Sequence, residues 1–99
     1  MKVQIQSIHF TADIKLEDVI KAKLTKLETF YDRIIDAEVF LKIDKDENRN
    51  NKEVEIKMNV PGANLFAKNK KASFEAAADE CTEALRRQLK KFKEKQLTH

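Results

Sequence analysis

One dipeptide, Pro61-Gly62, limits the folds open to this chain, because it holds the only proline and the only glycine among 99 residues. Proline followed by glycine is a strong turn signal. Just before it, apolar residues alternate with polar ones at Val54, Ile56, Met58 and Val60. This period is typical of a strand with one buried face. The pattern predicts a hairpin at residues 61–62, with a last short strand near Leu65 and Ala67.

The remaining segments follow the same two periodicities. Residues 2–8 and 37–43 alternate like strands, and the Asn-rich, charged stretch 45–51 reads as a hairpin loop. Helical spacing of apolar residues marks 16–31 and 73–96. Thr11 or Asp13 could cap the first helix, and Ser73 could cap the second. We therefore expect the order β-α-β-β-β-α, with three sequential strands forming an antiparallel meander.

The expected fold class is α+β, with one mostly antiparallel four-stranded sheet. Because each strand alternates, one sheet face is covered and the other is wet, and two helices with one apolar stripe each would pack on the covered face. We expect Ala37, Val39, Leu41 and Ile43 to face one way. The length supports a single domain, residues 1–99, with one core.

Composition excludes several classes of protein. Apolar residues make up 41% and charged residues 37% of the chain, which favours a globular domain with a solvated surface over a disordered one. No apolar run is long enough to cross a membrane, and the N-terminus lacks the core of a signal peptide. The single cysteine, Cys81, excludes an internal disulfide. We expect a cytoplasmic protein with no membrane partner.

Positive charge is concentrated at one end of the last helix. Residues 84–99 carry a net charge of +5, whereas the whole chain carries +3. On a helical wheel the buried stripe runs from Phe74 to Phe92 through Cys81 and Leu85, and the opposite, solvent-facing arc holds Arg86, Arg87, Lys90, Lys91 and Lys93. Such a face suits a polyphosphate partner. Acids first and bases last also complement the helix dipole, so a plain solvated face remains the alternative.

Other cations and aromatics are open to two interpretations. Lys23 lies beside the apolar stripe of the first helix, where its methylenes could be buried while its ammonium reaches water. Lysines on and after the last strand could extend a basic surface or protect an edge strand: Lys68, Lys70 and Lys71. Phe40 and Phe66 have the phase of the wet face, where they could stack on bases or pack under long side chains.

Nothing in the sequence favours catalysis or a cofactor. Neither His9 nor His99 has a second ligand at metal-binding spacing, and one glycine cannot build a phosphate-binding loop. Cys81 falls on the apolar stripe of the last helix and is expected in the core. Acids near Asp44 lie in the expected loop. We therefore expect no enzyme, no catalytic residue, no metal, no cofactor and no small-molecule substrate.

Two segments, AKLTKLETFYDRI at 22–34 and ALRRQLKKFKEKQ at 84–96, together carry a family likeness, with FLKIDKD at 40–46 between them. Their co-occurrence resembles the ribosome hibernation-promoting factors, relatives of ribosome-associated inhibitor A that are also called sigma modulation or ribosomal-subunit-interface proteins. The likeness runs from residue 1 to about residue 96. It implies a fold similar to double-stranded RNA-binding domains and, by length, a short form without the second domain that dimerises ribosomes.

The resemblance also implies a function and a site. Such a protein binds the small ribosomal subunit and its rRNA near the decoding centre, excludes messenger and transfer RNA, and inhibits translation under stress or in stationary phase. By position, the rRNA-facing role would fall on Lys23, Lys26, Arg33, Arg86, Arg87, Lys90, Lys91, Lys93 and Lys95. Two alternatives remain: a general double-stranded-RNA-binding domain, and a protein-interaction module that docks a partner on the wet sheet face.

Overall fold

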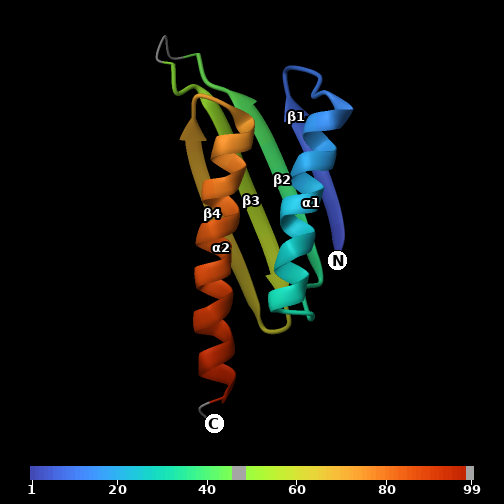
Figure 1. Ribbon diagram of the computed structural model, residues 1–99, viewed down its shortest axis with the longest axis vertical. Helices are drawn as coiled ribbons and strands as arrows, with labels where there is room; N and C mark the ends of the chain where they lie inside the picture. The colour runs from blue at the N-terminus through green and yellow to red at the C-terminus, as the bar shows by residue number, and fades with distance from the viewer. Residues whose placement is uncertain (46–48, 98–99) are drawn as a thin grey trace.

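The computed structural model describes residues 1–45 and 49–97. Its elements follow in the order β1 (Lys2–Ile8), α1 (Ile14–Phe30), β2 (Asp36–Ile43), β3 (Lys52–Val60), β4 (Ala63–Lys71) and α2 (Phe74–Leu97) (Figure 1). The predicted order β-α-β-β-β-α is therefore confirmed. Of the predicted loop 45–51, residues 46–48 lie outside the described part of the chain, as does His99.

The four strands form one sheet in the order β1-β2-β3-β4. β1 pairs with β2 in parallel, with Ile5 opposite Val39, because α1 returns the chain to the same end of the sheet before β2 begins. β2, β3 and β4 form the predicted antiparallel meander. The turn between β3 and β4 contains Gly62 at φ 84°, a left-handed conformation that glycine adopts without strain.

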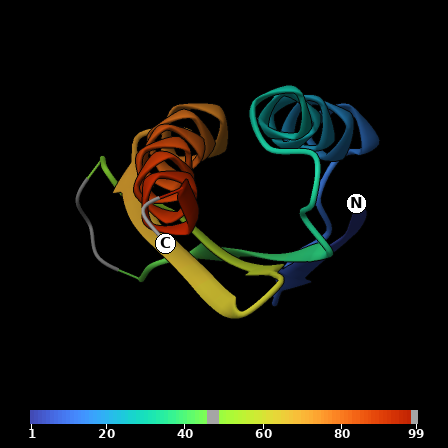
Figure 2. The same cartoon turned by 90° about the horizontal axis from the view of Figure 1, so that it is seen from below.

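Both helices lie on the same face of the sheet (Figure 2). They run in the same direction, so their C-terminal ends lie at the same end of the molecule, and the last turns of α2 project beyond the sheet (Figure 1). Asp13 caps α1 by accepting a hydrogen bond from the Lys15 amide at 3.0 Å. Ser73 caps α2 by accepting from the Ala76 amide at 3.1 Å. These caps begin both helices at the same end of the molecule, opposite the basic C-terminal half of α2.

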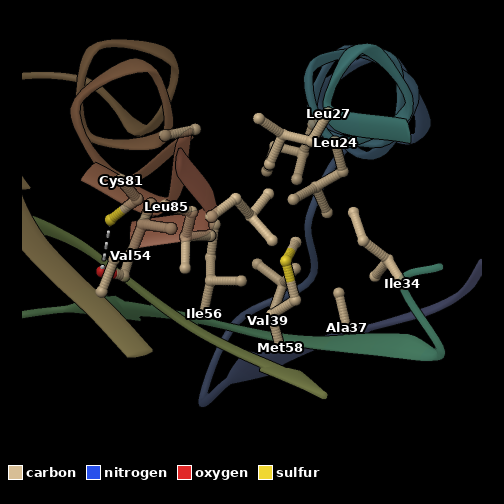
Figure 3. Packing of buried hydrophobic residues seen from close by; sticks show 14 of the residues in the cluster. Leu24, Leu27, Ile34, Ala37, Val39, Val54, Ile56, Met58, Cys81 and Leu85 are labelled. Atoms are coloured by element: carbon tan, nitrogen blue, oxygen red, sulfur yellow. Dashed lines mark hydrogen bonds between the residues drawn. The ribbon is translucent and has the colours of Figure 1, made fainter. Parts of the chain in front are cut away.

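The core fills the space between the helices and the covered sheet face (Figure 3). Leu24 of α1 and Leu85 of α2 are fully buried above Val39 and Ile56. No polar or charged residue is buried among those described. Burying an aliphatic side chain of this size contributes about 1.5–3 kcal/mol, so this layer fixes how the helices lie on the sheet.

Two strand ends differ from the sequence prediction. β4 runs to Lys71 and is longer than the short strand expected around Leu65 and Ala67. The side chain of Gln88 in α2 supports its outer edge, since it bonds both the amide and the carbonyl of Phe66. Ile43, expected to face the core side with Leu41, is 42% exposed at the end of β2, where it lines an open hollow.

Candidate nucleic-acid interface

Three cations lie exposed on the outer surface of α2, away from the groove between the helices. Arg87, Lys90 and Lys91 are exposed and line a shallow hollow with the carboxylate of Glu94. None of the three makes a hydrogen bond or an ion pair with any residue that the structure describes. Because they lie within about one turn of a rigid helix, their spacing is fixed before any ligand arrives. We call Arg87, Lys90 and Lys91 the outer triad.

A second group of cations lines a groove between the two helices. This interhelical groove is formed by polar residues over the apolar surface of Leu27 and Phe30, and the polar residues are Lys23, Lys26, Asp79, Thr82, Glu83 and Arg86. The Lys23 ammonium donates a hydrogen bond to the Asp79 carboxylate on the facing helix. Lys23 is therefore engaged with a carboxylate, where the sequence had suggested an ammonium that reaches water.

Arg86 is also held by a carboxylate. Its guanidinium donates to one oxygen of Glu83 through Nε at 3.1 Å and Nη2 at 2.6 Å. The hydrogen bond from Arg86, with the nearby Arg87 charge, holds the pKa of Glu83 below its ordinary value, so this carboxylate is ionised at neutral pH. Glu83 therefore pairs with Arg86, three residues along α2.

Lys93 was expected on the solvent-facing arc of α2, and that expectation is wrong. Its ammonium donates to the backbone carbonyl of Phe30 at 3.0 Å and lies 4.6 Å from the centre of the Phe30 ring. The side chain is half-buried because α1 occupies that side of α2. Lys93 therefore closes the C-terminal end of α1, which has no basic residue in its own last turn.

The other predicted cations lie near the same end of the molecule. Lys26 lines the interhelical groove without an ion pair to any described residue, and Arg33 is exposed just after α1. Lys95 lies in the last turn of α2, where a positive charge complements the helix dipole. The nine predicted cations thus fall into three groups. One is the outer triad, the second lines the groove, and the third lies at the C-terminal ends of the helices: Arg33, Lys93 and Lys95.

Cations on the open sheet face differ from the outer triad because acids of the same face hold them. Lys68 pairs with Glu53 at 3.5 Å, and Lys70 pairs with Asp44 at 2.7 Å. The two predicted wet-face aromatics do lie there. Phe66 is 47% exposed, and Phe40 is partly covered by the ammonium of Lys57, 5.4 Å from the ring centre. This face is charge-balanced locally, so the helices carry the unbalanced positive charge.

The one cysteine of the chain has a structural role in the core. Cys81 is buried, as expected, and its thiol donates to the Val54 carbonyl at 3.3 Å (Figure 3). Burial raises the pKa of the Cys81 thiol to about 12, so it is protonated at neutral pH. No cluster of metal-ligating side chains occurs within residues 1–45 and 49–97. Across the same residues, neither helix is long and apolar enough to cross a membrane.

Sequence reasoning did not identify Asp79 and Glu83 as part of this surface. In the sequence they belong only to the general pattern of acids first and bases last along this helix. Their position along one helix could not show that Asp79 faces a lysine 56 residues earlier in the chain. The only available sign was the placement of Lys23 beside the apolar stripe of α1, which brings its side chain close to whatever packs on that stripe.

Comparison with known proteins places the whole fold in one family. Residues 3–97 match the family described as Sigma 54 modulation protein / S30EA ribosomal protein. A ribosome hibernation promoting factor from Pseudomonas putida is 33% identical over 96 residues, covering 97% of this chain and 90% of that protein. A ribosome hibernation promotion factor from Deinococcus radiodurans is 37% identical over 79 residues, covering 79% of this chain and 41% of that protein.

Solved structures share the fold at lower identity. A ribosomal subunit interface protein from Coxiella burnetii superposes with a TM-score of 0.83 at 22% identity, covering 94% of this chain and 98% of that one. The N-terminal domain of Thermus thermophilus Protein Y superposes with a TM-score of 0.81 at 22% identity, covering 93% and 99%. The predicted arrangement of one sheet with two helices on one face is therefore confirmed.

Proposed function

This chain belongs to the family of sigma 54 modulation and S30EA ribosomal proteins, with a ribosome-associated role in hibernation, and on that premise we propose how it acts. It binds the small ribosomal subunit through rRNA near the decoding centre. In that position it occupies the volume that messenger and transfer RNA need, and so it inhibits translation under stress or in stationary phase. Residues 1–99 act as one ribosome-binding domain in this proposal.

The outer triad is the single observation that supports this proposal most directly. Exposed cations with no partner of their own release condensed counterions when they meet phosphates, and this release drives binding to RNA. Arg87, Lys90 and Lys91 meet this condition on the exposed surface of α2. Lys26 and Arg33 add two more exposed cations near the same end of the molecule.

The mechanism is steric and electrostatic. Folded rRNA presents phosphates in fixed positions and few accessible base edges, so shape and charge set the register of the protein. The buried layer under Leu85 and Leu89 holds α2 rigidly against the sheet, which keeps the spacing of the cations constant. Inhibition follows from occupancy, and the proposal involves no chemical step.

Sedimentation of the protein with isolated small subunits across a salt series tests the proposal. With about five phosphates neutralised, the log–log slope of affinity against salt should be about −4 to −5. Arg87→Glu combined with Lys91→Glu should abolish co-sedimentation at physiological salt while the thermal midpoint stays nearly unchanged. Lys15→Glu combined with Lys21→Glu is the matched control, because both lysines are exposed on α1 and the net charge changes equally.

Two outcomes would contradict the proposal. Retained co-sedimentation of the Arg87/Lys91 variant would show that the outer triad does not hold the subunit. Equal affinity for a free hairpin RNA and for the small subunit would favour a general double-stranded-RNA binder. Transfer RNA bound to the small subunit should compete with the protein if both occupy the decoding region, and absence of competition would place the protein elsewhere on the subunit.

A further inference from the structure

Two carboxylates lie inside the candidate interface, and each holds one of its cations. Asp79 accepts the hydrogen bond of Lys23 across the interhelical groove, and Glu83 accepts two from Arg86 on its own helix. Both acids line the groove together with Lys26. The groove therefore has three cations and two carboxylates, whereas the outer triad has three cations and a single carboxylate beside it.

Other acids of α2 do not share this arrangement. Glu75 and Glu80 are exposed on the same helix, and neither forms an ion pair with a residue that the structure describes. They change the overall charge of the protein as much as Asp79 and Glu83 do. They have no cation in contact, so they separate an effect of the ion pairs from an effect of overall charge.

We propose that Asp79 and Glu83 determine specificity in the RNA-binding surface by occupying Lys23 and Arg86 and so weakening the binding of flexible polyphosphates. This inference rests on the proposed RNA-binding function and deepens it. A flexible strand gains affinity by settling phosphates wherever cations are available. Because the two carboxylates hold the groove cations Lys23 and Arg86, the outer triad remains as the main phosphate site.

The physical basis is competition at close range. A phosphate that enters the groove must replace Asp79 at Lys23 or Glu83 at Arg86, and it then lies beside the displaced carboxylate. Exposed ion pairs of this kind are weak, so each one lowers polyphosphate affinity by about twofold to fivefold, and no more. A rigid rRNA surface that fits the outer triad bears little of this cost, because its phosphates need not enter the groove.

Fluorescence anisotropy with a labelled oligouridylate, a flexible single strand, tests the inference. Asp79→Asn and Glu83→Gln should each tighten binding about twofold to fivefold at low salt, and the double variant should tighten it further. The salt dependence of the double variant should become steeper by about one to two units of slope, because up to two more cations meet phosphates. All three variants keep exposed polar side chains at these positions, and circular dichroism verifies their helix content.

Two controls decide between local and general effects. Glu75→Gln combined with Glu80→Gln removes the same total charge and should change oligouridylate affinity less than the Asp79/Glu83 double variant does. In an Arg86→Gln background, Glu83→Gln should lose most of its effect, since Glu83 acts through Arg86. Equal effects of the two double variants, or an undiminished effect of Glu83→Gln without Arg86, would overturn the inference.

The measurement does not involve ribosomes, so its failure can be distinguished from failure of the proposed function. If the protein does not sediment with small subunits but the carboxylate variants bind oligouridylate more tightly, the competition stands and the ribosomal partner is wrong. If sedimentation succeeds and the variants bind oligouridylate as wild type does, the ribosomal partner stands and the competition is wrong.

Discussion

The ammonium of Lys93 donates a hydrogen bond of 3.0 Å to the carbonyl of Phe30 and rests 4.6 Å from the centre of its ring, so α2 closes the C-terminal end of α1. The last carbonyls of a helix have no partner within the helix. The C-cap residue Tyr31 uses its amide for the Leu27 carbonyl. Lys93 satisfies a further carbonyl from the neighbouring helix, and this ties the two parallel helices together at the end that bears most of the cations.

Replacing Lys93 with methionine should therefore destabilise the fold. Lys93→Met keeps the apolar stem but removes the charged donor and the ring contact, at a cost of about 1–2 kcal/mol. In a domain of this size, each kcal/mol lost lowers the thermal midpoint by roughly 4–8 °C. Lys90→Met, on the exposed outer triad, is the control and should leave the midpoint almost unchanged. Equal midpoints for both variants would show that Lys93 has no structural role.

Gln88 should protect the outer edge of β4. Its amide group bonds the Phe66 carbonyl at 2.7 Å and accepts from the Phe66 amide at 3.3 Å, as a neighbouring strand would. Gln88→Met preserves length but leaves both backbone groups without this partner, so we expect a loss of about 0.5–1.5 kcal/mol. Hydrogen exchange at the Phe66 amide should accelerate, whereas Gln96→Met should not change it. Unchanged exchange in Gln88→Met would argue that solvent already reaches this edge.

The free energy of unfolding should fall at alkaline pH because the Cys81 thiol is buried. Burial raises the pKa of its thiol from 9.0 to about 12, so the folded protein keeps a proton that the unfolded chain releases. This contribution is fully present below pH 9 and is lost as pH rises toward 12, with a limiting slope of about 1.4 kcal/mol per pH unit. Urea titrations from pH 8 to 10.5 should show a shallower decline for Cys81→Ala than for wild type. Parallel declines would mean that the thiol ionises as easily folded as unfolded.

The outer triad and the groove should respond differently to removal of a single charge. Lys90→Gln removes a cation that is not paired with any described residue, so the slope of small-subunit affinity against salt should fall by about 0.9 in magnitude. Lys23→Gln removes a cation that Asp79 already holds, so its effect should be smaller. Co-sedimentation across the salt series measures both. A larger loss for Lys23→Gln would place the RNA in the interhelical groove.

The fold could be predicted from the sequence because a local pattern of apolar, turn or capping residues marks each element. Alternation within residues 2–8 gives β1 with its observed bounds, and the Pro61-Gly62 turn fixes the hairpin of β3 and β4. Ser73 caps α2 as expected because a hydroxyl just before the apolar period meets an orphan amide. The parallel pairing of β1 follows from the intervening helix, which returns the chain before β2.

The detail of the candidate site could not be predicted, because it depends on contacts between helices. A wheel drawn for one isolated helix gives Lys93 a solvent-facing position, since it has no means of placing α1 beside it. The Lys93–Phe30 contact joins residues 63 positions apart, and the Lys23–Asp79 contact joins residues 56 apart. Local charge patterns predicted where cations gather, but tertiary packing determined which of them remain available to a ligand.

The parallel pairing of β1 with β2 also has a consequence for how the chain folds. β2, β3 and β4 pair with their neighbours in sequence through short loops, so the meander can assemble early at a small cost in loop closure. β1 has no partner until α1 has crossed over and β2 is in place. During synthesis the first strand must therefore wait for β2, and nascent chains truncated before residue 36 should lack the strand with which it pairs.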